Sequence, residues 1–203
     1  ALDSAPMALE EIIAAIEGAW QREQCVVRLH TGDPSLYGAI YEQMAELDKR
    51  SIPFRVIPGI TAAFAAAAAM KIEYTLPEIT QTLILTRMAG RTPVPELEDL
   101  ERLAAHRASM AIYLSITLVD KVQAVLVNAY GEDAVCAVAC KVSQPEEDIL
   151  YVKAKDLAAT VKHHNIRSQA LIIAGSALNT GLDQLKYKSK LYDSSFSHEF
   201  RSA

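Results

Sequence analysis

Apolar residues along the first half of the chain alternate between helical spacing and short continuous runs. Helical spacing predicts one helix near residues 9–20 and a second near residues 36–47. Between them, the apolar run at residues 25–29 predicts a buried strand, and a further strand is expected at residues 54–57. An alanine-rich helix should follow, with Thr61 as its N-cap. This order of helices and strands is typical of an α/β fold.

The second half repeats this alternation after a segment without periodicity that contains Pro77. We therefore expect two domains, an N-terminal α/β domain at residues 1–78 and a C-terminal α/β domain at residues 79–203. Apolar runs and helical spacing predict the elements of the second domain. The expected strands are residues 81–87, 109–115, 134–140, 149–153 and 169–175, and the expected helices are 96–106, 118–126 and 156–164.

Composition places the chain among globular proteins. Of its 203 residues, 51% are hydrophobic and 22% charged, which is enough to bury a sizeable core. The net charge of -5 argues against sequence-independent binding to nucleic acid, which needs a basic face. No apolar run is long enough to cross a bilayer without charges, so a cytoplasmic protein without a membrane partner is expected.

The three cysteines predict neither disulfides nor a metal site. Cys25, Cys136 and Cys140 form an odd set without a CxxC pair and lie in apolar runs. Buried thiols are therefore expected, in keeping with a reducing compartment.

Two turns follow predicted strands and contain residue types that often line ligand sites. They are HTGDPS, residues 30–35, and IPGIT, residues 57–61. In open α/β sheets, ligands bind outside the carboxyl ends of strands. Gly32 would let a ligand approach the backbone, and Asp33 could accept hydrogen bonds from a hydroxyl or an amine. Each turn alone is more often a structural connection, and Thr61 alone a helix cap, but the pair favours a site.

The common catalytic motifs are absent from the sequence. It contains no GxSxG, HExxH, GxxxxGK[ST] or GxGxxG pattern. Adjacent His163 and His164 should diverge on a helix, which indicates a solvated polar face. Ser115 lies at the end of a predicted strand, but no histidine and acidic partner can be assigned to it. We therefore assign no catalytic residue.

Four motifs, taken in order and spacing, resemble the tetrapyrrole methylases of cobalamin biosynthesis over essentially the whole chain. They are HTGDPSLYGA, VIPGITAAFAAAAA, EITQTLILTR with AGRTPVPE, and SKLYDSSFSHEFR. The first two are shared by the wider superfamily. RTPVPE and SKLYD resemble more closely the subgroup that methylates C-11 of precorrin-4 or cobalt-precorrin-4. The resemblance implies the two-domain tetrapyrrole methylase fold (class III methyltransferase) and a homodimer. Members of this family begin with a further strand and a Gly-rich loop, so the N-terminal domain resembles one without them.

The resemblance also implies the methyl donor and its contacts. S-adenosylmethionine should bind in the trough between the two domains. The residues carried over by motif are Thr31, Gly32, Asp33, Leu36, Thr61 and Ala62 from the first two motifs, and Leu114, Val142 and Ala170 from the C-terminal domain. Without the resemblance, the last three would be assigned to the sheet core.

The implied substrate is a polycarboxylate, so an acidic protein needs local positive charge to bind it. Arg87 and Arg91 flank the segment before TPVP and are expected to bind substrate carboxylates. Alternatively, Arg87 ends a strand in solvent and Arg91 pairs with Glu96 or Glu98.

Two other functions stay open on the sequence. One is a sister methylase acting on another tetrapyrrole, diphthine or ribosomal RNA, which RTPVPE disfavours. The other is a non-catalytic binding domain of the same fold.

Overall fold

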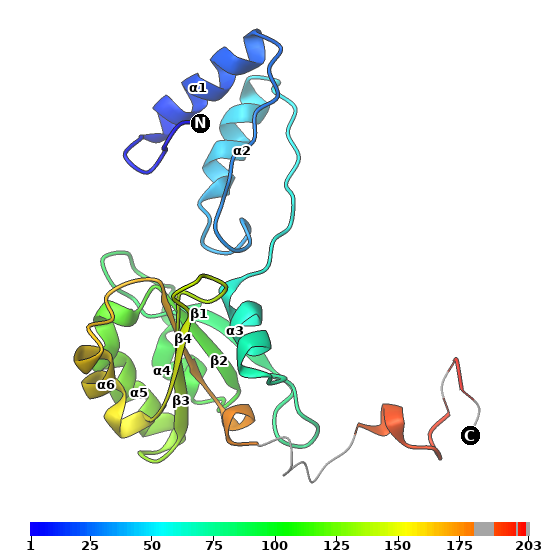
Figure 1. Ribbon diagram of the computed structural model, residues 1–203, viewed down its shortest axis with the longest axis vertical. Helices are drawn as coiled ribbons and strands as arrows, with labels where there is room; N and C mark the ends of the chain where they lie inside the picture. The colour runs from blue at the N-terminus through cyan, green and yellow to red at the C-terminus, as the bar shows by residue number, and fades with distance from the viewer. Residues whose placement is uncertain (181–188, 198, 202–203) are drawn as a thin grey trace. The chain divides into compact units, whose positions relative to one another are not determined.

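The computed structural model describes residues 1–180, 189–197 and 199–201. The chain forms two compact units, Ala1–Thr61 and Ala62–Ala203. The predicted boundary between residues 78 and 79 lies inside the second unit, because helix α3 (Ala62–Met70) packs on the sheet of that unit (Figure 1).

The second unit is built on a five-stranded mixed sheet of order β1-β2-β5-β3-β4. Its strands are β1 (Leu83–Arg87), β2 (Ser109–Tyr113), β3 (Val135–Cys140), β4 (Asp148–Lys153) and β5 (Ala170–Ala174). β1 runs parallel to β2, whereas β5 is antiparallel to both β2 and β3, and β4 is antiparallel to β3. All five strands predicted for the C-terminal half are confirmed.

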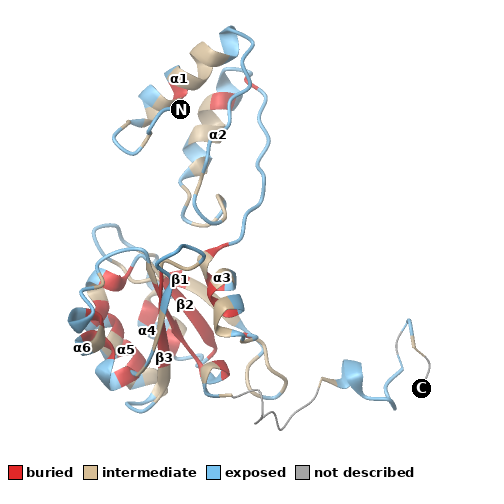
Figure 2. Ribbon diagram, viewed as in Figure 1, coloured by how far each residue is buried: buried red, intermediate tan, exposed pale blue. Residues whose placement is uncertain are grey.

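Successive residues of the strands face two different cores, as the two-residue period of a strand requires. Ile112 and Ile172 belong to a core under helices α4 (Leu100–Ala104), α5 (Val119–Tyr130) and α6 (Leu157–His163). Their neighbours in sequence, Ala111 and Ile173, face α3 on the other side (Figure 1). Figure 2 shows that buried residues are concentrated in the sheet and on the helix faces turned to it.

The predicted helix at residues 96–106 is divided at Asp99. The short 3-10 helix η1 (Glu96–Glu98) precedes it and α4 follows it. Asp99 has an extended backbone, and its carboxylate accepts a hydrogen bond from the Glu101 N–H at 2.9 Å. An N-cap of this kind starts a new helix, because it binds an N–H group that has no partner within the helix. The remaining 3-10 turns are η2 (Ile116–Leu118), η3 (Ala154–Asp156), η4 (Ser176–Asn179) and η5 (Lys190–Tyr192).

The first unit contains two helices, α1 (Leu9–Gln21) and α2 (Ile40–Lys49). Both predicted helices are confirmed, although the second begins at Ile40 rather than Leu36, because residues 34–38 form a tight turn. A Cβ atom on Gly38 would lie 2.1 Å from the Pro34 carbonyl oxygen, so only glycine fits there.

The strands predicted at residues 25–29 and 54–57 are wrong. None of residues 1–61, all of which the structure describes, forms a strand. Their apolar side chains are exposed instead, with Val27 at 75% and Ile57 at 60% of full exposure. Cys25, expected to be buried, is exposed for the same reason. An extended segment is stable only when neighbouring strands satisfy its backbone and cover its side chains, and these segments have no such neighbour in their unit.

Candidate functional site

The two turns predicted to converge do so within the first unit. We call residues 30–35 and 57–61 the turn pair. The Asp33 carboxylate accepts hydrogen bonds from the Gly59 N–H at 2.9 Å and from the Ser35 N–H at 2.8 Å. A Cβ on Gly59 would lie only 2.1 Å from the Gly32 carbonyl oxygen, so the two backbones are in direct contact. Gly32 also has a φ of 68°, a conformation that favours glycine.

Asp33 therefore has a structural task that its sequence context did not reveal. Hydrogen bonds from Gly59 and then Ser35 lower the pKa of the Asp33 carboxyl, since both stabilise its charged form. The carboxylate links two turns that are distant in sequence. A hydrogen bond from Asp33 to a ligand stays a prediction.

The other candidates near the turn pair differ in exposure. Thr31 is exposed and Leu36 is half-buried in the first unit. Thr61 is buried immediately before α3, and Ala62 is the first residue of that helix. Ala62 packs against the core beneath α3 and therefore belongs to the second unit.

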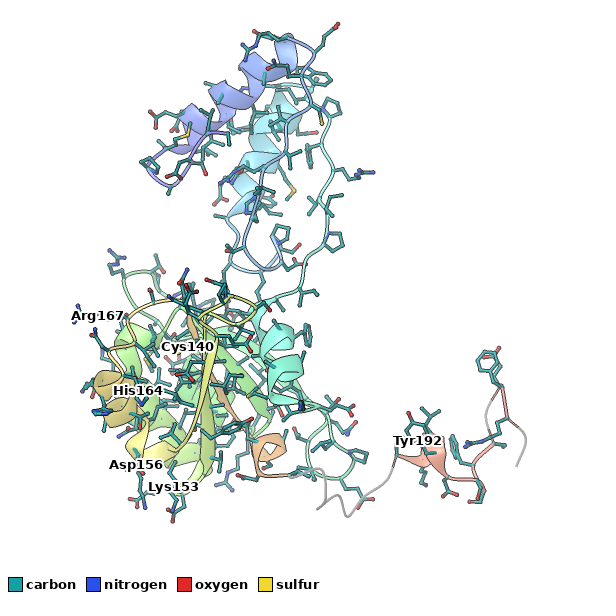
Figure 3. The ribbon with its side chains drawn as sticks, viewed as in Figure 1. Cys140, Lys153, Asp156, His164, Arg167 and Tyr192 are labelled. Atoms are coloured by element: carbon teal, nitrogen blue, oxygen red, sulfur yellow. The ribbon has the colours of Figure 1, made fainter. Side chains whose placement is uncertain are left out.

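The three C-terminal candidates lie at one end of the sheet, which we call the sheet edge. Here β1, β2 and β3 end and β5 begins, as the pairs Arg87 with Tyr113 and Cys140 with Ala170 show. Leu114 comes directly after Tyr113, and Val142 follows Cys140 by two positions. In Figure 3, Cys140 marks this end of the sheet, whereas Lys153 and Asp156 lie at the opposite end.

Leu114 is not a core residue. Its side chain is 70% exposed, and its φ of 53° is unusual for a residue with a side chain. Val142 and Ala170 are half-buried, but they pack against opposite faces of the sheet, Ala170 against the core under α4, α5 and α6 and Val142 against the core under α3. The sheet edge thus presents apolar surface to solvent at the carboxyl ends of three strands, where α/β proteins commonly bind ligands.

The segment that joins β1 to η1, residues 88–95, also starts at the sheet edge. The Arg87 guanidinium donates hydrogen bonds to the carbonyl oxygens of Pro93 at 2.7 Å and Thr92 at 3.1 Å. Arg87 thus ends its strand as the alternative expects, but its guanidinium binds backbone carbonyl groups of the protein. Arg91 is exposed on this segment, and Glu96, one of its expected alternative partners, binds Arg102 at 2.6 Å instead.

A polar network that the sequence did not predict joins the end of β2 to the start of α3. The Tyr113 hydroxyl accepts a hydrogen bond from the Ala63 N–H at 2.9 Å, which satisfies an amide in the first turn of α3. The hydroxyl of buried Tyr74 donates to the Ala63 carbonyl at 2.8 Å, and burial raises the pKa of Tyr74 well above its usual value. Tyr74 lies in a segment without periodicity, so no local signal indicated this role.

Among the residues that the structure describes, the other titratable groups point to no second reaction centre. Burial raises the pKa of Cys136 to about 12, which makes that thiol unreactive at neutral pH. The described residues contain no group of three or more side chains able to hold a metal ion. Across the same residues, no helix is long and apolar enough to span a lipid bilayer.

Comparison with known families identifies the chain at the family level. Residues 1–158 match the profile of the Tetrapyrrole (Corrin/Porphyrin) Methylases. The chain belongs to the tetrapyrrole methylases. It is 45% identical to the cobalt-precorrin-4 C(11)-methyltransferase of Priestia megaterium, over 98% of this chain and 78% of that protein. It is 48% identical to the enzyme of the same name from Methanocaldococcus jannaschii, over 99% of this chain and 77% of that protein.

Comparison with solved structures supports the same family and its fold. The chain resembles the crystal structure of a cobalt precorrin-4 methyltransferase with a TM-score of 0.85 and 45% identity, covering 88% of this chain and 75% of that one. A uroporphyrin-III C-methyltransferase from Thermus thermophilus, solved with S-adenosyl homocysteine, matches with a TM-score of 0.67 at 20% identity, covering 84% and 74%. At that identity the second match supports the fold alone.

Proposed function

We propose that this methylase transfers a methyl group from S-adenosylmethionine to C-11 of precorrin-4 or cobalt-precorrin-4 during cobalamin biosynthesis. The observation that carries the proposal is its identity of 45% and 48% with two cobalt-precorrin-4 C(11)-methyltransferases over nearly its whole length.

The sheet edge suits the adenosyl part of the donor. Leu114 is exposed at this end of the sheet, where Val142 and Ala170 are half-buried, so apolar contacts are available there to a planar base. In the first unit, Gly59 allows the backbones of the turn pair to pack against each other, and Gly32, with a φ of 68°, is a turn residue without a Cβ atom that a ligand could approach. We propose that each of these regions takes part in donor binding, together with Thr31, Asp33, Leu36, Thr61 and Ala62.

The proposed chemistry explains why no nucleophile or metal cluster stands out. When bound, S-adenosylmethionine would supply an electrophilic methyl group from its sulfonium to C-11. The sulfur would leave as a neutral thioether, and a proton would be lost from the conjugated macrocycle. The residues of the chain therefore need to supply neither an acid for the leaving group nor a covalent intermediate. Their main task is to hold the ring carbon in line with the methyl group, and positioning of this kind can supply most of a rate enhancement.

An isotope experiment tests the reaction. The chain would be incubated anaerobically with precorrin-4, or its cobalt complex, and a donor whose methyl carbon is 13C. We expect one 13C methyl group in the product, bonded to C-11 by NMR. A label on another ring carbon would indicate a sister methylase. If the chain bound the donor in calorimetry but produced no labelled tetrapyrrole, the proposed reaction would be wrong, and if it bound neither ligand, a scaffold role would replace it.

A pair of glycine variants tests the turn pair. Gly32→Val should weaken binding of S-adenosylhomocysteine at least about tenfold, because it forces a branched side chain into a left-handed backbone at the proposed site. Gly131→Val is the matched control, since Gly131 also has positive φ, 98°, but nothing within 4 Å of its Cβ position. If both variants lost stability and neither lost affinity, the turn pair would be purely structural.

A second pair tests the sheet edge. Leu114→Ala should weaken S-adenosylhomocysteine binding several-fold and leave stability nearly unchanged, since Leu114 is 70% exposed. Tyr151→Ala, which truncates a 54% exposed side chain on β4, is the control. If both variants bound S-adenosylhomocysteine with the same affinity, Leu114 would not belong to the donor site.

We infer further that the enzyme works as a homodimer in the cytoplasm. The family resemblance supports the dimer, and three cysteines without disulfides fit a reducing compartment. Sedimentation equilibrium at micromolar concentration should give twice the mass of the chain. A monomer under these conditions would contradict the dimer.

A further inference from the structure

Residues 88–95 have few hydrogen bonds of the kind that order a loop. Pro93 and Pro95 have no N–H group to donate. Within the segment, the Gly90 N–H donates to the Thr92 carbonyl at 3.2 Å. At its start, the Met88 N–H donates to the Ser115 hydroxyl at 2.9 Å, and Ser115 is fully buried.

The Arg87 side chain supplies two further hydrogen bonds that order this segment. Its Nη2 atom donates to the Pro93 carbonyl and its Nη1 atom to the Thr92 carbonyl. The planar guanidinium can bind two successive carbonyl oxygens at once, whereas a lysine ammonium has no such fork. Arg87 thereby closes the segment back onto the end of β1, with Arg91 inside the closed loop.

Arg87 and Arg91 therefore have different surroundings, although the sequence pairs them. The forked donors of Arg87 are directed at the protein's own backbone. Arg91 is exposed on the loop that Arg87 closes. A charged group on an ordered loop binds its ligand with a smaller entropic cost than the same group on a loose one.

We propose that Arg87 is a positioning residue, which orders residues 88–93 so that Arg91 is held ready to bind a carboxylate of the tetrapyrrole. This inference rests on the proposed function, because it takes the substrate from it. It replaces the expectation that both arginines bind substrate directly.

The first measurement needs no substrate. Trypsin cleaves after Arg91 only when the loop opens, so cleavage of the native chain at that bond reports loop order. Arg87→Ala and Arg87→Lys should both raise the cleavage rate about tenfold, since each removes the fork. Arg102→Ala is the matched control, because it removes one positive charge from an exposed ion pair and should leave the rate unchanged. Unchanged cleavage in both Arg87 variants would overturn the proposal.

The second measurement is a double-mutant cycle on tetrapyrrole binding, followed by absorbance titration with precorrin-4. Arg91→Ala should weaken binding about tenfold and reduce its salt dependence, as expected for a lost charge-assisted contact. Arg87→Ala should weaken binding in the wild-type background but have little effect once Arg91→Ala is present, because Arg87 acts through Arg91. Additive losses would show that Arg87 contacts the substrate itself.

Folding and the proposed function are tested separately. Each variant should retain the wild-type affinity for S-adenosylhomocysteine, and Ser115→Ala should loosen the same loop from its other end. If the wild-type chain bound no tetrapyrrole, the proposed function would be wrong, and so would the assignment of a substrate carboxylate as the partner of Arg91. The cleavage rates would then still support or overturn the ordering role of Arg87.

Discussion

The two units contain similar apolar patterns, but only the second unit forms strands from them. In the second unit, runs such as residues 109–113 and 170–174 became strands with nearly every side chain buried. In the first unit, residues 25–29 and 54–57 are also mostly apolar, apart from Arg28 and Arg55, yet they form no strand and stay exposed.

The difference lies in what each element needs from the rest of the chain. A helix satisfies its own backbone, so α1 and α2 require only the small cluster of Ile13, Leu47 and Ile52 between them. A strand requires neighbours for its backbone and a covering layer for at least one face. The second unit provides both, with helices on each side of five paired strands.

The largest expected effect is a loss of stability that differs between the cores of the two units. Ile172→Ala, in the fully buried centre of the sheet, should lower the free energy of unfolding of the second unit by about 2–5 kcal/mol. Ile13→Ala should cost the first unit about 2 kcal/mol, the lower end of that range, because the partly buried Leu9 and Ile16 can close around the smaller side chain. Denaturant unfolding combined with amide exchange in each unit measures both. Equal losses would contradict the contrast between the cores.

Gly59→Ala should disturb the first unit through its turns rather than its core. The added Cβ would meet the Gly32 carbonyl at 2.1 Å, so the turn pair must separate, at a cost of about 1–3 kcal/mol. Gly18→Ala is the control in the same unit. Gly18 lies inside α1 with only a flexible arginine end near its Cβ position, so that substitution should stabilise by about 0.5–1 kcal/mol. Amide exchange of residues 31–35 would show the separation, and its absence would mean the turns adjust without strain.

Alkaline pH should affect the second unit. Burial, and to a smaller degree the nearby Cys136, raises the pKa of Tyr130 to about 12, and its hydroxyl donates to the Ala108 carbonyl at 2.8 Å. The unfolded chain releases this proton near pH 10, so the free energy of unfolding should fall between about pH 10 and pH 12. Tyr130→Phe should lose about 1 kcal/mol at neutral pH and show a shallower alkaline fall. An unchanged slope in this variant would assign the fall to Cys136 and other groups.

Acid pH provides the smallest and most local test, in the first unit. Because the folded-state pKa of Asp33 is lowered, its link to Gly59 is fully present above about pH 4 and is lost as pH falls through the lower folded value. The Gly59 amide proton should therefore titrate with a midpoint below the usual aspartate value in NMR spectra. Asp33→Asn should abolish this titration, and a midpoint at the ordinary value would show that the hydrogen bonds do not form in solution.

Much of the second unit could be predicted from the sequence, because its signals are local. Apolar runs and helical spacing located all five of its strands and helices α4, α5 and α6, alanine content located α3, and four sequence motifs identified the family. These features depend on residues within one or two turns of each other, which the sequence determines directly.

Tertiary structure alone decided which of the predicted elements formed. Whether residues 25–29 become a strand depends on distant partners, which their own sequence does not contain. Asp33 bonds to Gly59, 26 positions away, and Tyr113 to Ala63, 50 positions away, so neither role follows from spacing. The same holds for Leu114, whose exposure results from its place just past the end of β2. Burial and hydrogen-bond partners are properties of the assembled unit, because they arise only when distant segments meet.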